Sequence, residues 1–208
     1  MATTFRDTIT DLDGLRGIIP DPGAAGQRKQ LSKLDEHCRW FISQTPFIFI
    51  ATSNAAGDCD LSPKGDEPGF VQVLDDETMV IPDRPGNQRA DSLRNLLENP
   101  HIGTLFVIPG VEWTLRVNGR ASIIRDEDVL ERCAVKGKRP ALGIAVHVEE
   151  AFLHCPKCFI RSNLWDNNGW MPEEEHPSFA AILKEQTKYD IPVEVIEKAL
   201  ASSNEKLW

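Results

Sequence analysis

The sequence has no long hydrophobic run. Its longest apolar stretch, residues 46–51, is far shorter than the roughly 20 residues that cross a bilayer. Residues 1–7 lack the apolar region of a secretory leader and include an early acidic residue, which argues against a secretory or transit peptide. We therefore expect a cytoplasmic protein that does not span a membrane.

Basic residues are in the minority. The chain has 23 Lys and Arg against 32 Asp and Glu, a net charge of −9 at pH 7. A nucleic-acid-binding protein usually carries a broad basic surface, so we expect no nucleic-acid partner. Any phosphate-bearing partner must be small enough for a local basic pocket.

Cysteine is scarce, and no sequence repeat of fixed period is evident. The five cysteines are an odd number with irregular spacing, which suits reduced cytoplasmic thiols better than a disulfide framework. They are Cys38, Cys59, Cys133, Cys155 and Cys158.

What is present is a chain of 208 residues, 41% hydrophobic and 26% charged, enough for one domain with extra helices. Residues 1–29 are turn-rich and predict a loose arm. Apolar residues at three- and four-residue steps predict helices. These helices cover residues 28–44, 86–99 and 126–134, with further helical segments after 179 that include 193–201.

The middle of the chain is rich in β-prone residues separated by short polar turns. The predicted strands cover residues 47–52, 59–64, 70–74, 78–81, 102–108, 113–124 and 142–153. We take these seven stretches as roughly six strands, and with two helices between them they favour a closed or nearly closed antiparallel barrel, because closure removes exposed sheet edges. The fold class is mainly β with flanking helices.

The segment of residues 81–93 joins a strand to a helix through a Pro/Gly turn. Asn87 can cap that helix, and a helix start presents unpaired N–H groups to an anion. Arg84 and Arg89 add guanidinium groups suited to phosphate, and Lys64 ends a neighbouring strand. The alternative is that both arginines are surface residues paired with Asp83 and Asp91.

Thr114, Arg116 and Asn118 alternate along one predicted strand and therefore share a face. Three polar groups on one face suggest a ligand or an interface. A solvent-facing strand explains the pattern equally well.

Several segments, taken in order, resemble the pyridoxamine 5'-phosphate oxidase-like flavoproteins. The segments that carry this resemblance are residues 47–52, 62–66, 81–89, 98–100 and 115–121. The resemblance covers roughly residues 30–166 and implies a six-stranded antiparallel split barrel that binds flavin mononucleotide (FMN), followed by a helical extension over residues 167–208. It also implies a homodimer with FMN at the subunit interface.

The resemblance assigns flavin contacts by position. On the phosphate and ribityl side they are Leu61, Ser62, Pro63, Lys64, Ile81, Pro82, Asn87, Gln88 and Arg89, to which we add Arg84 from the strand-turn-helix argument. Thr114 matches a position that reaches the flavin ring, with Arg116 beside it. Residues 154–165 look like the C-terminal signature of a subgroup, which implies that Lys157, Arg161, Ser162 and Trp165 approach the flavin from the second chain.

No catalytic residue can be assigned. The five histidines are scattered, and none forms a nucleophile–base or metal-ligand pattern. Cys155 and Cys158 have zinc-site spacing, but no second pair completes four ligands, and the βαβ context of a thioredoxin-like dithiol is missing. We therefore expect no metal.

The expected function is an FMN-dependent oxidoreductase that transfers hydride between the flavin and a small molecule, because the cofactor performs the demanding step. Residues 204–208 lack the Arg-Leu-x-Pro-type segment that helps true pyridoxamine phosphate oxidases hold their substrate, so we do not expect that substrate here. The alternatives are a flavin carrier, sensor or storage protein with little turnover, and a barrel that holds a deazaflavin or haem.

Overall fold

The computed structural model describes residues 3–205 and 207, and in these residues the strands form one antiparallel sheet. The sheet has seven strands in the order β2-β1-β5-β6-β7-β4-β3. They are β1 (Phe47–Ser53), β2 (Cys59–Gly65), β3 (Gln72–Val73), β4 (Thr78–Pro82), β5 (His101–Val107), β6 (Thr114–Ile124) and β7 (Gly143–His154).

The expectation of six strands is wrong by one. Each observed strand lies within or close to a predicted stretch, and β3 is the shortest, with two residues paired to β4. The order ends at β2 on one side and β3 on the other. Because no pairing joins these two end strands within the described residues, the split barrel stays a prediction.

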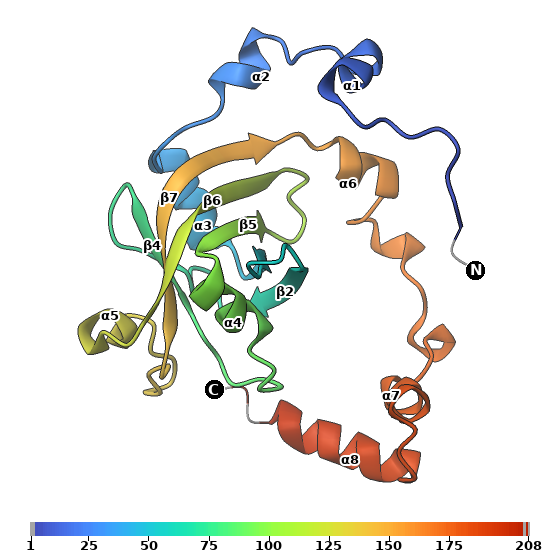
Figure 1. The fold of residues 1–208 in the computed structure, drawn as a ribbon. Coiled ribbons are helices and arrows are strands. Elements are labelled where there is room, and N and C mark those ends of the chain that lie inside the picture. The colour runs from blue at the N-terminus through green and yellow to red at the C-terminus, as the bar shows by residue number, and fades with distance from the viewer. Residues whose placement is uncertain (1–2, 206, 208) are drawn as a thin grey trace.

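Helices flank the sheet and also lie in both terminal segments (Figure 1). They are α1 (Leu12–Ile18), α2 (Ala24–Arg28), α3 (Glu36–Gln44), α4 (Asp91–Glu98), α5 (Glu127–Glu131), α6 (Lys157–Ser162), α7 (Phe179–Thr187) and α8 (Val193–Asn204), with short 3-10 turns at Asn167–Gly169 and Glu173–Glu175.

The helix predicted over residues 28–44 is wrong at its start. The chain leaves α2 at Arg28, and Leu31 pairs with Ala151 of β7 through two backbone hydrogen bonds of 2.9 and 2.8 Å. Helix α3 begins only after Asp35, whose side chain accepts a hydrogen bond from the Cys38 N–H at 2.8 Å. Leu31 therefore adds a bridge to the sheet instead of a turn to the helix.

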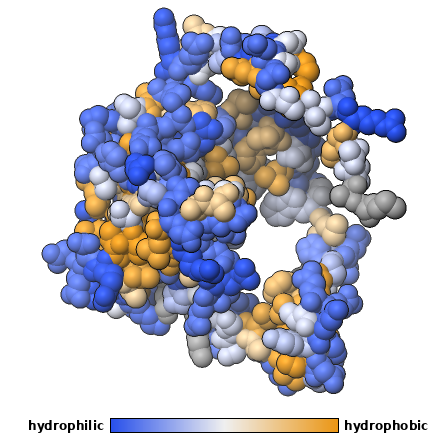
Figure 2. Space-filling view, viewed as in Figure 1, coloured by the Kyte–Doolittle hydropathy of each residue, from blue (hydrophilic) through white to orange (hydrophobic). Residues whose placement is uncertain are grey.

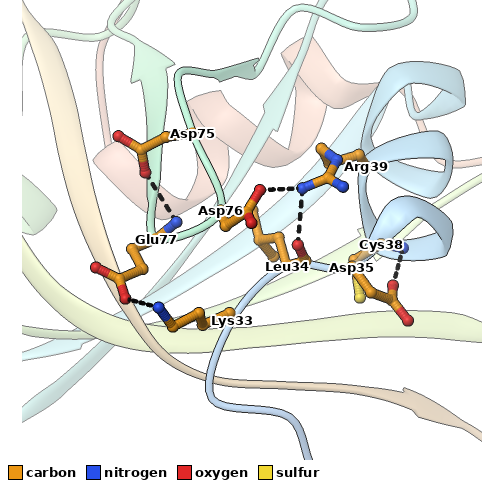
Figure 3. Close-up of polar contacts among 8 residues, drawn as sticks. All are labelled: Lys33, Leu34, Asp35, Cys38, Arg39, Asp75, Asp76 and Glu77. Atoms are coloured by element: carbon orange, nitrogen blue, oxygen red, sulfur yellow. Dashed lines mark hydrogen bonds and ion pairs between the residues drawn. The ribbon is translucent and has the colours of Figure 1, made fainter.

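Polar contacts tie the start of α3 to the turn between β3 and β4 (Figure 3). Arg39 donates to the Leu34 carbonyl at 2.9 Å and forms an ion pair with Asp76. Lys33 pairs with Glu77 in the same turn. These contacts hold α3 where its apolar side chains Cys38, Phe41 and Ile42 are buried.

The core lies between α3 and the inner face of the sheet. It is built from aliphatic and aromatic side chains of β1, β4, β5, β6 and β7, with Ile48, Ile50, Phe106, Leu115 and Val117 fully buried. At the bulge between Asn118 and Gly119, a Cβ on Gly119 would lie 2.0 Å from the His147 carbonyl oxygen. Only glycine allows β6 and β7 to approach so closely there.

Both terminal segments run apart from this body. In Figure 1 the blue N-terminal segment passes over the top and the red C-terminal helices descend on the right, and Figure 2 shows the C-terminal helices separated from the body by an open gap. Helices α7 and α8 pack on each other, and Ala180 is their one buried residue among those described.

Large apolar side chains are exposed on both terminal segments. They are Phe5, Ile9, Leu12, Leu15, Ile18 and Ile19 near the N-terminus, and Ile160, Leu164, Trp170, Met171, Phe179, Tyr189, Ile191, Val195 and Leu207 near the C-terminus. Among the described helices none combines the length and apolar character needed to cross a bilayer.

Candidate functional site

A pocket of about 400 Å³ opens where β2, the loop after β4 and the start of α4 meet. Its lining consists of Asp60, Leu61, Ser62, Pro63, Lys64, Ile144 and all residues from Asp83 to Leu93. Eight of the predicted cofactor residues line it together: Leu61, Ser62, Pro63, Lys64, Arg84, Asn87, Gln88 and Arg89.

Strand alternation places the β2 side chains. Asp60, Ser62 and Lys64 are half-buried on one face, whereas Leu61 and Pro63 on the other face are exposed. Because β2 is the end strand of the sheet, Pro63 removes no hydrogen bond that a further strand would need. The strand thus carries Lys64 to the pocket at a sheet edge.

Two cations of the pocket are each paired with a carboxylate. Lys64 Nζ lies 3.3 Å from an Asp83 oxygen. Arg89 Nε lies 2.8 Å from an Asp91 oxygen, with the Arg89 side chain 72% exposed, and this hydrogen bond and charge raise the pKa of Arg89. Since a guanidinium has five N–H donors, the pairing through Nε leaves Arg89 able to bind an anion as well.

Arg84 is placed differently. Its Nε lies 2.6 Å from an oxygen of Asp66, whose side chain is 1% exposed, and its Nη2 donates to the Cys133 carbonyl at 2.8 Å. These bonds fasten the loop after β4 to the end of β2 and to the segment after α5. The guanidinium is held mainly as a structural link at the wall of the pocket.

The helix predicted from residue 86 begins at Asp91, so Asn87 is not its cap. Ala90 precedes the helix with φ 56° and ψ 25°, and no side chain caps the helix start. Asn87 instead accepts from the Arg89 N–H at 3.0 Å, and Gln88 is also left-handed, with φ 60°. Left-handed residues beside a helix start occur in the backbone concavities that bind anions, so this loop suits a phosphate.

A second hollow, of about 550 Å³, lies on the face of β1, β2, β5 and β6 and is mainly apolar. It is lined by Phe49, Ala51, Leu61, Gly103, Thr104, Leu105, Arg116, Asn118 and His154. Leu61 lines both spaces, so the anion-suited pocket and the apolar hollow are neighbours.

Polar groups stand at one side of the second hollow. Arg116 Nη2 donates to Glu150 at 2.6 Å, Asn118 donates to the same oxygen at 2.9 Å, and the Arg116 guanidinium lies 4.0 Å from the Phe152 ring centre. Arg116 Nε is buried without a hydrogen-bond partner. Burial, followed by the charges of Arg116 and Lys29, lowers the pKa of His154, so its imidazole stays neutral at physiological pH.

Other predicted site residues lie outside both spaces. Ile81 and Pro82 are buried in β4, and Thr114 is 3% exposed. Lys157, Arg161 and Ser162 belong to α6, which lines neither space. Trp165 donates from Nε1 to the Val111 carbonyl at 3.0 Å and stacks on Phe159 with ring centres 5.7 Å apart.

Sequence reasoning missed Asp60 and Asn95. Asn95 on α4 donates to Asp60 at 2.9 Å and to Thr52 at 3.1 Å, which fastens the helix to β1 and β2 beside the pocket. The signal for Asp60 was its alternation with Ser62 and Lys64 along one strand. The part of the chain that the structure describes holds no group of three or more His, Cys, Asp or Glu side chains arranged for a metal.

Solved structures with a similar fold come from several bacteria. HupZ of Group A Streptococcus is 21% identical over 58% of this chain and 93% of that one, with a TM-score of 0.47. An FMN-binding protein of Syntrophomonas wolfei is 11% identical over 55% and 78%, with a TM-score of 0.43. HutZ, the haem storage protein of Vibrio cholerae, is 18% identical over 59% and 94%, with a TM-score of 0.41.

Comparison with curated proteins finds no match. The family model described as pyridoxamine 5'-phosphate oxidase matches residues 34–155, which include every strand of the sheet and both spaces described above. The chain therefore belongs to the pyridoxamine 5'-phosphate oxidase family.

Proposed function

We propose that this protein binds FMN and uses it as an oxidoreductase that transfers hydride to or from a small molecule. The observation that carries the proposal is the 400 Å³ pocket, which gathers Lys64, Arg89 and the uncapped start of α4 in a chain of this family. In an otherwise acidic protein, this arrangement supplies local cations and backbone donors for one small anion.

In the proposed complex the phosphate lies at the start of α4. Arg89 and Lys64 contribute charge, and the loop through Gln88 contributes backbone N–H groups. Leu61 connects this pocket to the apolar hollow, where a flat ring system would find aliphatic surface. When bound there, FMN supplies the two-electron chemistry, and the residues of the chain bind it, orient it and exclude water.

We propose further that the protein is a homodimer. Residues 30–166 would form the flavin domain, and the terminal segments 1–29 and 167–208 would lie outside it. Lys157, Arg161, Ser162 and Trp165 line neither space within one chain, which is compatible with their reaching the flavin of a second chain. The free thiols support the cytoplasm as the proposed compartment.

The first experiment identifies the cofactor. The purified protein is expected to be yellow, with a flavin absorbance spectrum and a released molecule of the mass of FMN. A haem or deazaflavin spectrum would contradict the proposed cofactor. Reduction of the oxidised flavin by a candidate amine or reduced nicotinamide, or reoxidation of the reduced flavin by a quinone, would support an enzyme, whereas a failure of all three would favour a flavin carrier or store.

The second experiment tests the site by titrating the apoprotein with FMN. Arg89→Ala and Lys64→Ala should each raise Kd by about tenfold to a hundredfold, because a charge-assisted hydrogen bond contributes about 1.5–3 kcal/mol. Arg16→Ala is the matched control, because Arg16 also forms an exposed ion pair, with Asp21, but does not line the pocket. Equal affinities in all these variants would exclude the site.

A further inference from the structure

The five thiols fall into two groups. Cys38 and Cys133 are buried, and burial raises the pKa of Cys133 and raises that of Cys38 to about 11. Cys59, Cys155 and Cys158 are exposed. Because the thiolate is the reactive form and needs access to its reagent, exchange chemistry is confined to the three exposed thiols.

Cys155 and Cys158 are joined by a tight turn. Cys155 follows the last residue of β7, Pro156 has φ −76° and ψ −5°, and Lys157 is the first residue of α6. The two central residues of the four-residue segment are therefore right-handed helical, which brings its outer Cα atoms within about 7 Å. Disulfides join Cα atoms about 4.4–6.8 Å apart, so this turn brings the two Cα atoms into the range that a disulfide spans.

Contacts of α6 and the segment after it hold the turn from its C-terminal side. Ile160 N–H donates to the Pro156 carbonyl at 3.0 Å, and Phe159 stacks on Trp165, which is itself bonded to Val111. No third ligand among the described residues completes a metal site with this pair. Neither thiol has a role in the proposed flavin site.

We propose that Cys155 and Cys158 form a reversible dithiol–disulfide pair that exchanges electrons with small-molecule disulfides. One thiol loses its proton and attacks a sulfur of the small disulfide, which releases one small thiol and leaves a mixed disulfide on the protein. The second cysteine then attacks the protein sulfur of that mixed disulfide and releases the second small thiol. The small disulfide gains two electrons and two protons, and the protein pair loses them.

Lys157 makes the bond directly measurable, because trypsin cleaves between the two cysteines. The full-length protein is equilibrated with reduced and oxidised glutathione, quenched with acid, alkylated and digested. The expected product is the peptide ending at Lys157 joined to the peptide Cys158–Arg161, lighter by two hydrogens than the separate dithiol forms. Excess reduced glutathione should separate the two peptides again.

Cys59 is the internal control, because it is exposed but has no neighbouring cysteine in the sequence. It should carry glutathione as a mixed disulfide under the same conditions. In Cys155→Ser and Cys158→Ser the remaining thiol should behave like Cys59 and retain glutathione, because no partner is present to displace it.

The proposal fails if Cys155 and Cys158 of the wild-type protein each retain glutathione as Cys59 does. It also fails if both stay reduced while Cys59 reacts, or if the linked peptides come from two chains, which a nonreducing gel of the undigested protein would reveal as a covalent dimer. None of these readouts measures bound FMN, so a failure of the thiol pair and a failure of the flavin site give different results.

Discussion

Arg84 and Arg89 lie five positions apart on one loop, line one pocket and have different surroundings. Arg84 is 15% exposed and bonded to a buried carboxylate, whereas Arg89 is 72% exposed and paired with a partly exposed one. A buried charge that loses its partner is costly, while an exposed ion pair contributes little. Removal of Arg84 should therefore lower the stability of the fold, whereas removal of Arg89 should leave the stability almost unchanged.

We predict that Arg84→Ala lowers the free energy of unfolding by about 2 kcal/mol, because it removes one charge-assisted hydrogen bond to the buried Asp66 carboxylate. Arg89→Ala should change that free energy by no more than about 0.5 kcal/mol while weakening FMN binding. Urea denaturation of both variants measures the difference. Equal stabilities would show that the Arg84–Asp66 pair is not a structural link.

The ion pairs show which residue contacts the sequence can predict. The alternative interpretation as surface residues pairs Arg89 with Asp91, two positions away, and the structure shows this pair. The same alternative pairs Arg84 with Asp83, but Asp83 pairs with Lys64 and Arg84 pairs with Asp66, 18 positions upstream. Asp66 becomes a neighbour of Arg84 only when the end of β2 packs beside the loop after β4. The spacing of residues along the sequence does not predict this packing.

Helix α3 is the element that covers the core, and its start depends on one carboxylate. Burial raises the pKa of Asp35, but the hydrogen bonds from Cys38 outweigh it, so the pKa lies below its usual 3.8. A carboxyl whose pKa is lower in the folded state stabilises the fold above the unfolded-state value. That contribution is lost as the pH falls from 3.8 through the folded-state pKa.

We predict that Asp35→Ala lowers the free energy of unfolding by about 1 kcal/mol near neutral pH, the usual contribution of a helix N-cap. Asp35→Asn is the matched control, since asparagine caps as well as aspartate but does not titrate. The wild type should lose any advantage over Asp35→Asn as the pH drops below 3.8. An Ala variant as stable as the Asn variant would show that the cap is unimportant.

For whole elements, the local sequence pattern predicts where the strands lie better than it predicts which strands pair. Alternation and turn residues located the strands, because those signals are carried by neighbouring residues. The sheet order, with β6 between β5 and β7 and β4 beyond β7, depends on packing between distant segments. The start of α4 was misplaced for a similar reason, since the left-handed backbone of Ala90 is not evident from an alanine.

The molecule as a whole consists of a body that contains the core and terminal segments that contribute little to it. Every member of the buried apolar cluster lies between Leu34 and Ala151. Residues beyond 166 add the buried Ala180, which lies outside that cluster. The stability of the body should therefore be independent of the C-terminal extension.

We predict that a chain ending after residue 166 unfolds with a free energy within about 0.5 kcal/mol of the full chain, the range typical of surface changes. A chain ending after residue 142 is the contrast, because it loses β7, which pairs with both β6 and β4, and should not fold. Circular dichroism during urea denaturation separates these outcomes. If the chain that ends after residue 166 fails to fold, the C-terminal extension is part of the folding unit.

In the proposed homodimer, we assign the apolar hollow on the face of β1, β2, β5 and β6 to the contact between the two copies. Leu105 is half-buried in this hollow, whereas Leu97 on α4 is 78% exposed and lines neither the hollow nor the flavin pocket. A glutamate in an apolar interface would be desolvated on association, and unpaired buried charges are strongly unfavourable. The same substitution at the two leucines therefore separates an interface from an ordinary surface.

We predict that the wild type and Leu97→Glu sediment as dimers and that Leu105→Glu sediments as a monomer in analytical ultracentrifugation. Leu105→Glu should also retain less FMN, because the proposed contacts from Lys157 to Trp165 come from the second chain. A monomeric wild type would refute the homodimer. A dimeric Leu105→Glu with unchanged FMN would instead show that two copies meet elsewhere, and the hollow would then be left to the flavin ring or its substrate alone.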